Sequence, residues 1–151
     1  MTEKDNCIFC KIIDGRIPSN ILYEDDLFKI ILDVSPAAKG HAMILPKVHV
    51  ANLYELPDEL SSRILKLAKK MAIHMKKELK CDGVQLVQNN EEAAGQSVFH
   101  YHMHIIPRYH DDMQEITWKP GKVTEEELKE LMNILRLNSG KEMVPFLDEN
   151  S

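Results

Sequence analysis

The hydrophobic positions of the first 110 residues fall into short runs, which are rich in aliphatic residues and bounded by Gly, Pro, Asp or Asn. Runs of this length between turn-forming residues are typical of β-strands. They predict five strands, which cover residues 21–24, 27–33, 41–45, 84–88 and 98–106. Proline cannot donate a hydrogen bond to a neighbouring strand, so Pro46 and Pro107 are expected to end the third and the fifth strand.

A helical spacing begins at Pro57, a residue that suits the first turn of a helix. Hydrophobic residues then recur every three or four positions, at Leu60, Ile64, Leu67, Met71, Met75 and Leu79. This pattern predicts one long helix that buries a single face. The helix is expected to end before Asp82-Gly83.

Two shorter helices are expected near the ends of the chain. The first covers residues 7–14 and stops at the glycine that follows. The second covers residues 124–138 and begins with Thr124-x-x-Glu127, the pattern of a capping box. Its hydrophobic face holds Leu128, Leu131 and Leu135, and Ser139-Gly140 is expected to stop it.

The predicted strands come in groups and do not alternate strictly with helices, which favours an α+β fold with an antiparallel sheet. The length suits a single domain over residues 1–151, with a core at 7–110 and a C-terminal extension at 111–151. Neither of the glycine-rich motifs that bind dinucleotides or nucleoside triphosphates occurs in the sequence.

The chain has 151 residues, and 19 Lys and Arg against 24 Asp and Glu give a net charge of −5. Binding along a nucleic-acid backbone needs a basic excess, so this charge argues against that class of partner. No apolar run approaches the roughly 20 residues of a membrane helix, and residues 1–6 do not resemble a secretory signal. Three cysteines do not form a disulfide framework, which leads us to expect a cytoplasmic protein.

Three of the seven histidines stand within five residues, in the fifth predicted strand. Side chains alternate between the two faces of a strand, so one face is expected to carry His100, His102 and His104. Buried imidazoles need polar partners, which leaves three interpretations: an exposed polar face, a metal site, or acid–base and nucleophilic chemistry. A spacing of about 7 Å along one strand suits three ligands of one ion poorly.

The segment 100–106, H-Y-H-M-H-I-I, matches at every position the signature of the histidine triad (HIT) family, in which three histidines alternate with apolar residues. Further family motifs occur in the family's order, namely F-C-K-I-I-D-G-R-I-P-S, Y-E-D-D, L-D-V-S-P-A-A-K-G-H and P-K-x-H. The chain therefore resembles this family over residues 7–110, and most closely its bacterial, Hint-like branch with a Cys-x-x-Cys pair. The resemblance implies a homodimer that joins through the long helix and the edge strand 84–88.

The resemblance also implies an activity, the hydrolysis of nucleoside phosphoramidates or related AMP-linked substrates at the α-phosphorus. In the family pattern His102 attacks the phosphorus and forms a nucleotidyl-histidine, which water then hydrolyses. His100 orients His102, while His104 binds the phosphate and helps to protonate the leaving group. The positions that match contacts to the phosphate and the leaving group are Asn89, Gln96 and Ser97. No organic cofactor is implied.

A purine nucleotide is the ligand that the resemblance implies, with Asp33 accepting the ribose hydroxyls. The purine pocket would be lined by Phe9, Ile12, Ile17 and Ile31. Simpler roles stay open for each of these residues. The apolar side chains are also suited to core packing, and Asp33 and Asn89 are residue types that stabilise turns.

Other activities share the triad. A dinucleoside polyphosphate hydrolase (Ap3A/Ap4A) has the same motif, and a non-catalytic nucleotide-binding or scaffold protein is the rival outside enzymes. A nucleotidyltransferase generally carries Gln in place of the third histidine, where this chain has His104. Repair of DNA ends is disfavoured by the acidic charge.

Cys7 and Cys10 form a Cys-x-x-Cys pair that is open to redox, metal-binding and structural readings. A redox pair needs a thioredoxin-like βαβ context, which the predicted elements do not provide. Structural zinc needs four ligands, and the resemblance supplies the set Cys7, Cys10, His49 and His100, with one zinc per chain. The simpler alternative is two buried thiols.

The remaining histidines have no role in this scheme. His41 is expected at the end of a strand, His74 on the surface of a helix and His110 in a loop. Trp118 in the C-terminal extension has two open roles, covering the leaving group or packing against a partner chain.

Overall fold

The computed structural model describes residues 3–115 and 118–137. They belong to two compact units, which divide after Glu115. The elements of the first unit are α1 (Glu3–Asn6), α2 (Ile8–Ile13), β1 (Ile21–Glu24), β2 (Phe28–Leu32), β3 (Ala42–Pro46), a 3₁₀ turn (Leu53–Glu55), α3 (Asp58–Leu79), β4 (Gly83–Val87), a second 3₁₀ turn (Glu92–Ala94) and β5 (Met103–Arg108). The second unit contains α4 (Glu125–Leu135).

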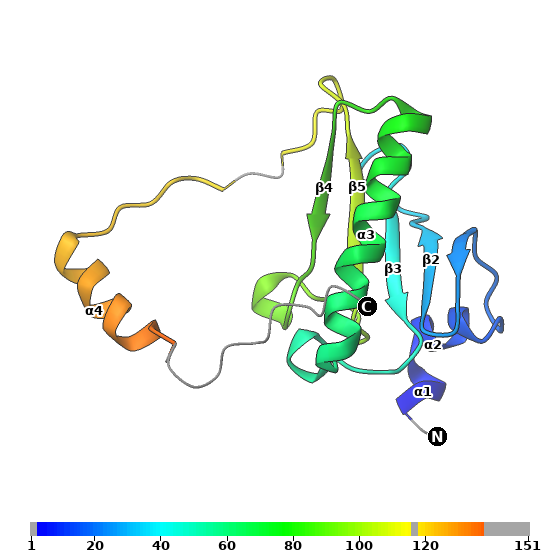
Figure 1. Cartoon of the computed structure of the whole chain (residues 1–151), viewed down its shortest axis with the longest axis horizontal. Coiled ribbons are helices and arrows are strands. Elements are labelled where there is room, and N and C mark those ends of the chain that lie inside the picture. Colours follow the sequence, from blue (N-terminus) through cyan, green and yellow to red (C-terminus); the bar gives the residue numbers. More distant parts are fainter. Residues whose placement is uncertain (1–2, 116–117, 138–151) are drawn as a thin grey trace, which may run out of the picture. The chain divides into compact units, whose positions relative to one another are not determined.

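The five strands of residues 3–115 form one antiparallel sheet in the order β1-β2-β3-β5-β4, with the long helix α3 running along it (Figure 1). This arrangement confirms the predicted α+β class with about five strands, one long helix and shorter helices. The first four strands lie within about two residues of their predicted limits. Edge strand β4 is the one that was expected over residues 84–88.

The sheet carries one hydrophobic cluster on each face, because successive side chains of β2 and β3 point to opposite sides. On one face Ile30 and Ile44 pack with Ile64 and Ala68 of α3. On the other face the side chains of β2 and β3 pack with α2, in a cluster of Cys7, Phe9, Cys10, Ile12, Ile31, Met43 and Leu45. The face that carries α2 also carries the histidines described below.

The fifth strand differs from its prediction at both ends, since it covers Met103–Arg108 and not residues 98–106. Its pairing with β3 is limited to three residues on each strand, and the backbone N–H of Tyr101 donates instead to Val50 O, at 2.8 Å. Pro107 lies inside the strand, opposite Val84 of β4. It is tolerated because the pairing with β3 has already ended at Ile105, so no N–H is needed on that side.

In the second unit, α4 begins with the predicted capping box. Thr124 accepts from the N–H of Glu127, and Glu127 accepts in return from the N–H of Thr124. The helix ends at Leu135, before the predicted limit, and the expected stop at Ser139-Gly140 lies outside the described residues. Among residues 3–115 and 118–137, no helix has both the length and the apolar character of a membrane span.

Candidate active site and metal centre

The three triad histidines lie at and just before the start of β5, on the sheet face that carries α2. Tyr101, Met103 and Ile105 belong to the opposite cluster under α3, so the predicted alternation of faces is present. His100 is fully buried, whereas His102 and His104 are half-buried. The rings of His102 and His104 meet edge to face, with centroids 5.1 Å apart.

The central histidine is held in one tautomer by the backbone. His102 Nδ1 lies 2.8 Å from the carbonyl oxygen of His100. A carbonyl only accepts, so Nδ1 carries the hydrogen and Nε2 keeps its lone pair. Burial lowers the pKa of His102, although the contact with the His100 carbonyl and the charge of Asp33 oppose this effect. His102 therefore presents an unprotonated nitrogen near neutral pH, as a nucleophile requires.

His100 has the opposite arrangement. Its Nε2 lies 2.8 Å from Pro46 O and donates to it, so the lone pair is on Nδ1. Nδ1 faces the Sγ atoms of Cys7 and Cys10, each at 3.5 Å, and His49 Nδ1 at 3.2 Å. Burial lowers the pKa of His100 to about 4. The lone pair of His100 is thus available to a cation and not to a phosphate.

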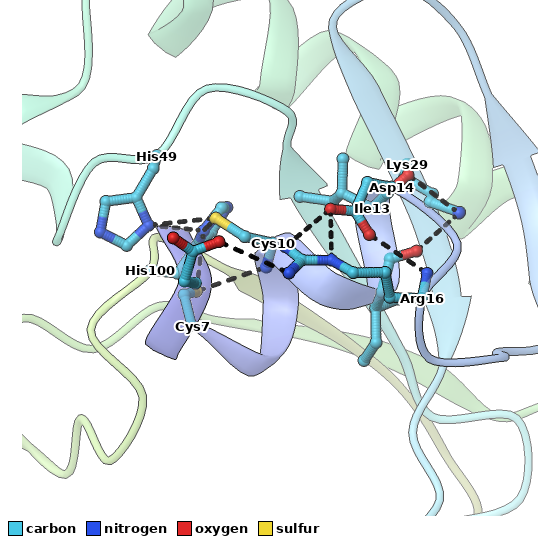
Figure 2. A network of polar contacts seen from close by, with 10 residues as sticks. Cys7, Cys10, Ile13, Asp14, Arg16, Lys29, His49 and His100 are labelled. Carbon is cyan, nitrogen blue, oxygen red and sulfur yellow. Dashed lines mark hydrogen bonds and ion pairs between the residues drawn. The ribbon is translucent and has the colours of Figure 1, made fainter. Parts of the chain in front are cut away.

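These four side chains form a compact cluster, with all ligand atoms within 4.8 Å of one another (Figure 2). In a tetrahedral zinc site, bond lengths of about 2.3 Å to sulfur and 2.0–2.1 Å to nitrogen place sulfur and nitrogen roughly 3.6 Å apart. The sulfur–nitrogen distances here, 3.3–3.5 Å, are close to that value. Burial, followed by the effects of Cys7, raises the pKa of Cys10 to about 11, so a cation is needed to stabilise its thiolate. Cys7, Cys10, His49 and His100 thus have the donor atoms and spacing to hold a metal ion.

Helix α2 is fixed at both ends, which positions the cluster. At its start, Cys7 is the N-cap, and its Sγ accepts from the N–H of Cys10 at 3.3 Å. At its end, Lys29 Nζ reaches across from β2 and donates to Ile12 O at 3.0 Å. An ammonium group at the last carbonyls of a helix complements its dipole, and Lys29 is only 4% exposed. α2 thereby also places Phe9 against the triad, with its ring centroid 5.0 Å from that of His102.

One histidine of the site was not predicted from the sequence. His41 was expected only at the end of a strand, and it does directly precede β3. Its Nε2, however, lies 2.8 Å from His104 Nδ1 and 3.6 Å from Asp33 Oδ2. The antiparallel pairing of Met43 with His104 brings these side chains together. His74 is exposed on α3 and His110 is exposed in a turn, as expected.

The four residues expected around the purine lie together in the cluster against α2. Phe9, Ile12 and Ile31 are buried there, and Ile17 is partly buried against them. Both open readings are compatible with this position, because the cluster is core and also touches the triad through Phe9. Asp33 forms the turn that its sequence context allows, since its Oδ1 accepts from the N–H of Ser35 at 2.8 Å.

The residues expected at the phosphate and the leaving group differ in how far they are available. Gln96 is buried, and its amide holds three backbone groups: the N–H of Glu91 and the carbonyls of Ala51 and Val98. Through these hydrogen bonds, Gln96 holds its loop in place. Ser97 is exposed, and it lines a cavity of about 600 Å³ together with Cys7, Ile8, His49, Val98 and Phe99, among others. Asn89 is half-buried.

The family model described as HIT domain matches residues 14–111. The chain therefore belongs to the HIT family. The chain is 50% identical over 105 residues to "Protein hit" of Bacillus subtilis, which covers 70% of this chain and 72% of that protein.

Two further relatives have names that state an activity. "Adenosine 5'-monophosphoramidase HNT1" of Saccharomyces cerevisiae is 40% identical over 119 residues, which is 79% of this chain and 73% of that protein. "Adenylylsulfatase HINT3" of Arabidopsis thaliana is 40% identical over 111 residues, which is 74% of this chain and 56% of that protein.

Solved structures share the fold. A crystal structure of a HIT family member from Bacillus subtilis has a TM-score of 0.81 and 43% identity, and the match covers 89% of this chain and 99% of that one. A Zn-bound histidine triad protein from Mycobacterium smegmatis has a TM-score of 0.71 and 33% identity, with 78% of this chain and 86% of that one covered.

Proposed function

We propose that this chain is a hydrolase of nucleoside phosphoramidates or related AMP-linked substrates, which acts through a nucleotidyl-histidine on His102. The observation that carries the proposal is the His102 tautomer. Because the His100 carbonyl holds the hydrogen on Nδ1, the lone pair of Nε2 is available for attack at phosphorus. The names of relatives that cleave AMP amides or adenylyl sulfate support the same class of reaction.

In the first step, His102 Nε2 forms a bond to the α-phosphorus while the phosphorus–nitrogen bond of the substrate breaks, and the leaving nitrogen takes up a proton from the solvent. In the second step, the oxygen of water bonds to phosphorus, the bond to Nε2 breaks and one proton is released. The products are a nucleoside monophosphate and an amine. Splitting one displacement into two easier ones is the usual benefit of covalent catalysis.

The substrate roles implied by the family resemblance are part of this proposal. His104 binds the phosphate, Ser97 and Asn89 lie toward the phosphate and the leaving group, and Asp33 accepts the ribose hydroxyls. The exposure of Ser97 and the partial exposure of Asn89 support their availability. Gln96 contributes by holding its loop in place, because its amide is already hydrogen-bonded to backbone groups.

We also propose one structural zinc ion per chain, held by Cys7, Cys10, His49 and His100. The distances within the cluster and the zinc-bound relative support it. When bound, the ion cross-links α2 to the segment before β5 and to the His49 loop. The Pro46 carbonyl fixes the His100 ring in the orientation that a ligand needs, as partners of zinc-bound histidines commonly do. Three unpaired cysteines support a reducing compartment, the cytoplasm.

A panel of substrates tests the proposed reaction. The purified chain is mixed with adenosine 5'-phosphoramidate, diadenosine polyphosphates, an acyl-adenylate and adenylyl sulfate, and release of AMP is followed. We expect kcat/KM for the phosphoramidate to exceed that for the diadenosine compounds by at least roughly tenfold. A preference for the diadenosine compounds would favour the polyphosphate hydrolase. Binding without turnover of any compound would favour the non-catalytic alternative.

A homodimer that joins through β4 and α3 is the assembly we propose. β4 is an edge strand, and its Leu86 is 41% exposed. On α3, Leu65 and Ile73 are more than half exposed, although both are large hydrophobic residues. Light scattering of the untagged chain should give about 35 kDa, twice the 17.4 kDa of one chain. The Leu86→Lys variant should shift the mass toward one chain, and a monomeric parent protein would refute the proposal.

A further inference from the structure

His41 is not used in the attack on phosphorus, yet it is fixed as firmly as the triad. It is 6% exposed. Its backbone closes the preceding loop, since its N–H donates to Ala38 O at 3.1 Å and its carbonyl accepts from the N–H of Asp33 at 2.9 Å. Gly40 precedes it with φ +92°, and a Cβ there would lie 2.6 Å from Leu79 Cδ1. The position of His41 is therefore fixed by the backbone and the packing around it.

The backbone determines which nitrogen of His41 bears the hydrogen. The N–H of Ala37 donates to His41 Nδ1 at 2.9 Å, so Nδ1 uses its lone pair. A neutral imidazole has one N–H, which must then be on Nε2. An independent contact agrees, because the Asp33 carboxylate lies 3.6 Å from Nε2 and favours a hydrogen at that atom.

The hydrogen on His41 Nε2 in turn determines the state of His104. Nε2 donates to His104 Nδ1 across 2.8 Å, so His104 Nδ1 is an acceptor and its own hydrogen must be on Nε2. A second proton on His104 would place two N–H groups face to face at that distance. The contact is therefore compatible with a neutral His104 and incompatible with its imidazolium.

We infer that His41 is a positioning residue, which holds His104 neutral with its hydrogen on Nε2, so that His104 donates a hydrogen bond to the substrate phosphate and does not supply the proton of the leaving group. The inference rests on the proposed function for the identity of that phosphate. It changes one role implied by the family resemblance, in which His104 also protonates the leaving group. A neutral imidazole that gave up its only hydrogen would become an anion.

The surroundings of His104 agree with this state. Burial lowers the pKa of His104 to about 4, and the neighbouring His102 and His41 act in the same direction. Asp33 acts in the opposite direction and is the weakest of the four causes. Burial also lowers the pKa of His41. These are the titratable groups that face His104 from the described residues around it.

A metal ion is the competing explanation, because Asp33, His41 and His104 lie close enough to hold one. A histidine that ligates a metal through Nε2 carries its hydrogen on Nδ1 and donates it to an acceptor. His41 has the reverse arrangement, since Nδ1 accepts from a backbone N–H. The hydrogen on Nε2 then occupies the position that a metal would need.

Nuclear magnetic resonance of ring nitrogens in ¹⁵N-histidine-labelled protein tests the inference directly. In the wild-type chain we expect His104 to show a protonated Nε2 and an unprotonated Nδ1 from pH 8 down to about pH 5. The His104→Gln variant assigns the signals of His104 by their loss. If the spectrum of the wild-type chain placed the hydrogen of His104 on Nδ1, that result alone would overturn the inference.

Two substitutions separate the hydrogen-bond role from a packing role. In His41→Gln the amide oxygen can accept from Ala37 while its N–H donates to His104, so the tautomer should be retained. In His41→Glu both oxygens accept, so the hydrogen of His104 should move to Nδ1 and its pKa should rise by at least about one unit. An unchanged His104 in the glutamate variant would refute the inference. Because these readouts need no turnover, a failure of the proposed hydrolysis would remain distinguishable.

Discussion

Replacement of His102 by Ala is expected to lower kcat/KM for adenosine 5'-phosphoramidate by about 10⁴-fold or more. The loss is large because, among the described residues, no other ring nitrogen of the site has a lone pair available for attack on phosphorus. His100 Nδ1 faces the cysteines, and His104 Nδ1 is occupied by His41. AMP binding is expected to change only a few fold, since His102 contributes one ring among several contacts.

Initial rates and isothermal titration calorimetry with AMP are measured on the same preparations of the His102→Ala variant. His74→Ala is the matched control, because it also removes one imidazole, from an exposed position on α3. It should behave as the wild-type chain does. Turnover by His102→Ala at a rate near that of the control would show that another group attacks the phosphorus.

Loss of the metal cluster is expected to have the largest effect on stability. Cys10→Ser should reduce bound zinc from one per chain to a trace and lower Tm by about 5–15 °C, because a buried cross-link between α2, the His49 loop and the triad segment is lost. Removal of zinc from the wild-type chain by a chelator should produce a similar shift. Elemental analysis and calorimetric melting of untagged protein provide the two readouts.

Cys81→Ala is the control for this experiment. It removes a buried thiol that packs in the cluster under α3, on the other face of the sheet from Cys7 and Cys10. Its zinc content should stay at one per chain, although some stability is lost through the small cavity. An absence of zinc from the wild-type chain would reject the metal site. So would a Tm of Cys10→Ser equal to that of the wild-type chain, together with no shift of the wild-type Tm on treatment with the chelator.

Local sequence patterns were sufficient for most elements of the fold. The long helix α3 follows from hydrophobic spacing alone, and α4 follows from Thr124 and Glu127, whose contacts span only three residues. The limits of β5 needed non-local information. They depend on how far β3 and β4 pair with it, and on the contact between Tyr101 and Val50.

The same distinction explains what was found and missed in the site. The alternation of His100, His102 and His104 is a local pattern, so their shared face could be predicted. The role of His41 depends on the register of β3 against β5, a pairing between segments about 60 residues apart in the sequence. The amide of Gln96 is similarly engaged by Ala51, a residue that no local pattern connects to it.

The net charge of −5 argues against a binder of long nucleic acids, but it is compatible with this site. A single phosphate can be held by neutral donors, of which the Nε2–H of His104 is one, and needs no basic surface. The acidic composition and the proposed nucleotide substrate are therefore consistent with each other.

Chemical capture of the intermediate tests the central claim most directly. Wild-type protein is mixed with adenosine 5'-phosphoramidate, stopped in alkali within the first turnover and digested, because the bond between phosphorus and imidazole is labile in acid. Mass spectrometry should find one adenylyl group on the peptide that contains the triad, attached to His102, and the group should disappear as AMP is released. An adduct on a different residue, or AMP release without an adduct on His102, would contradict the account.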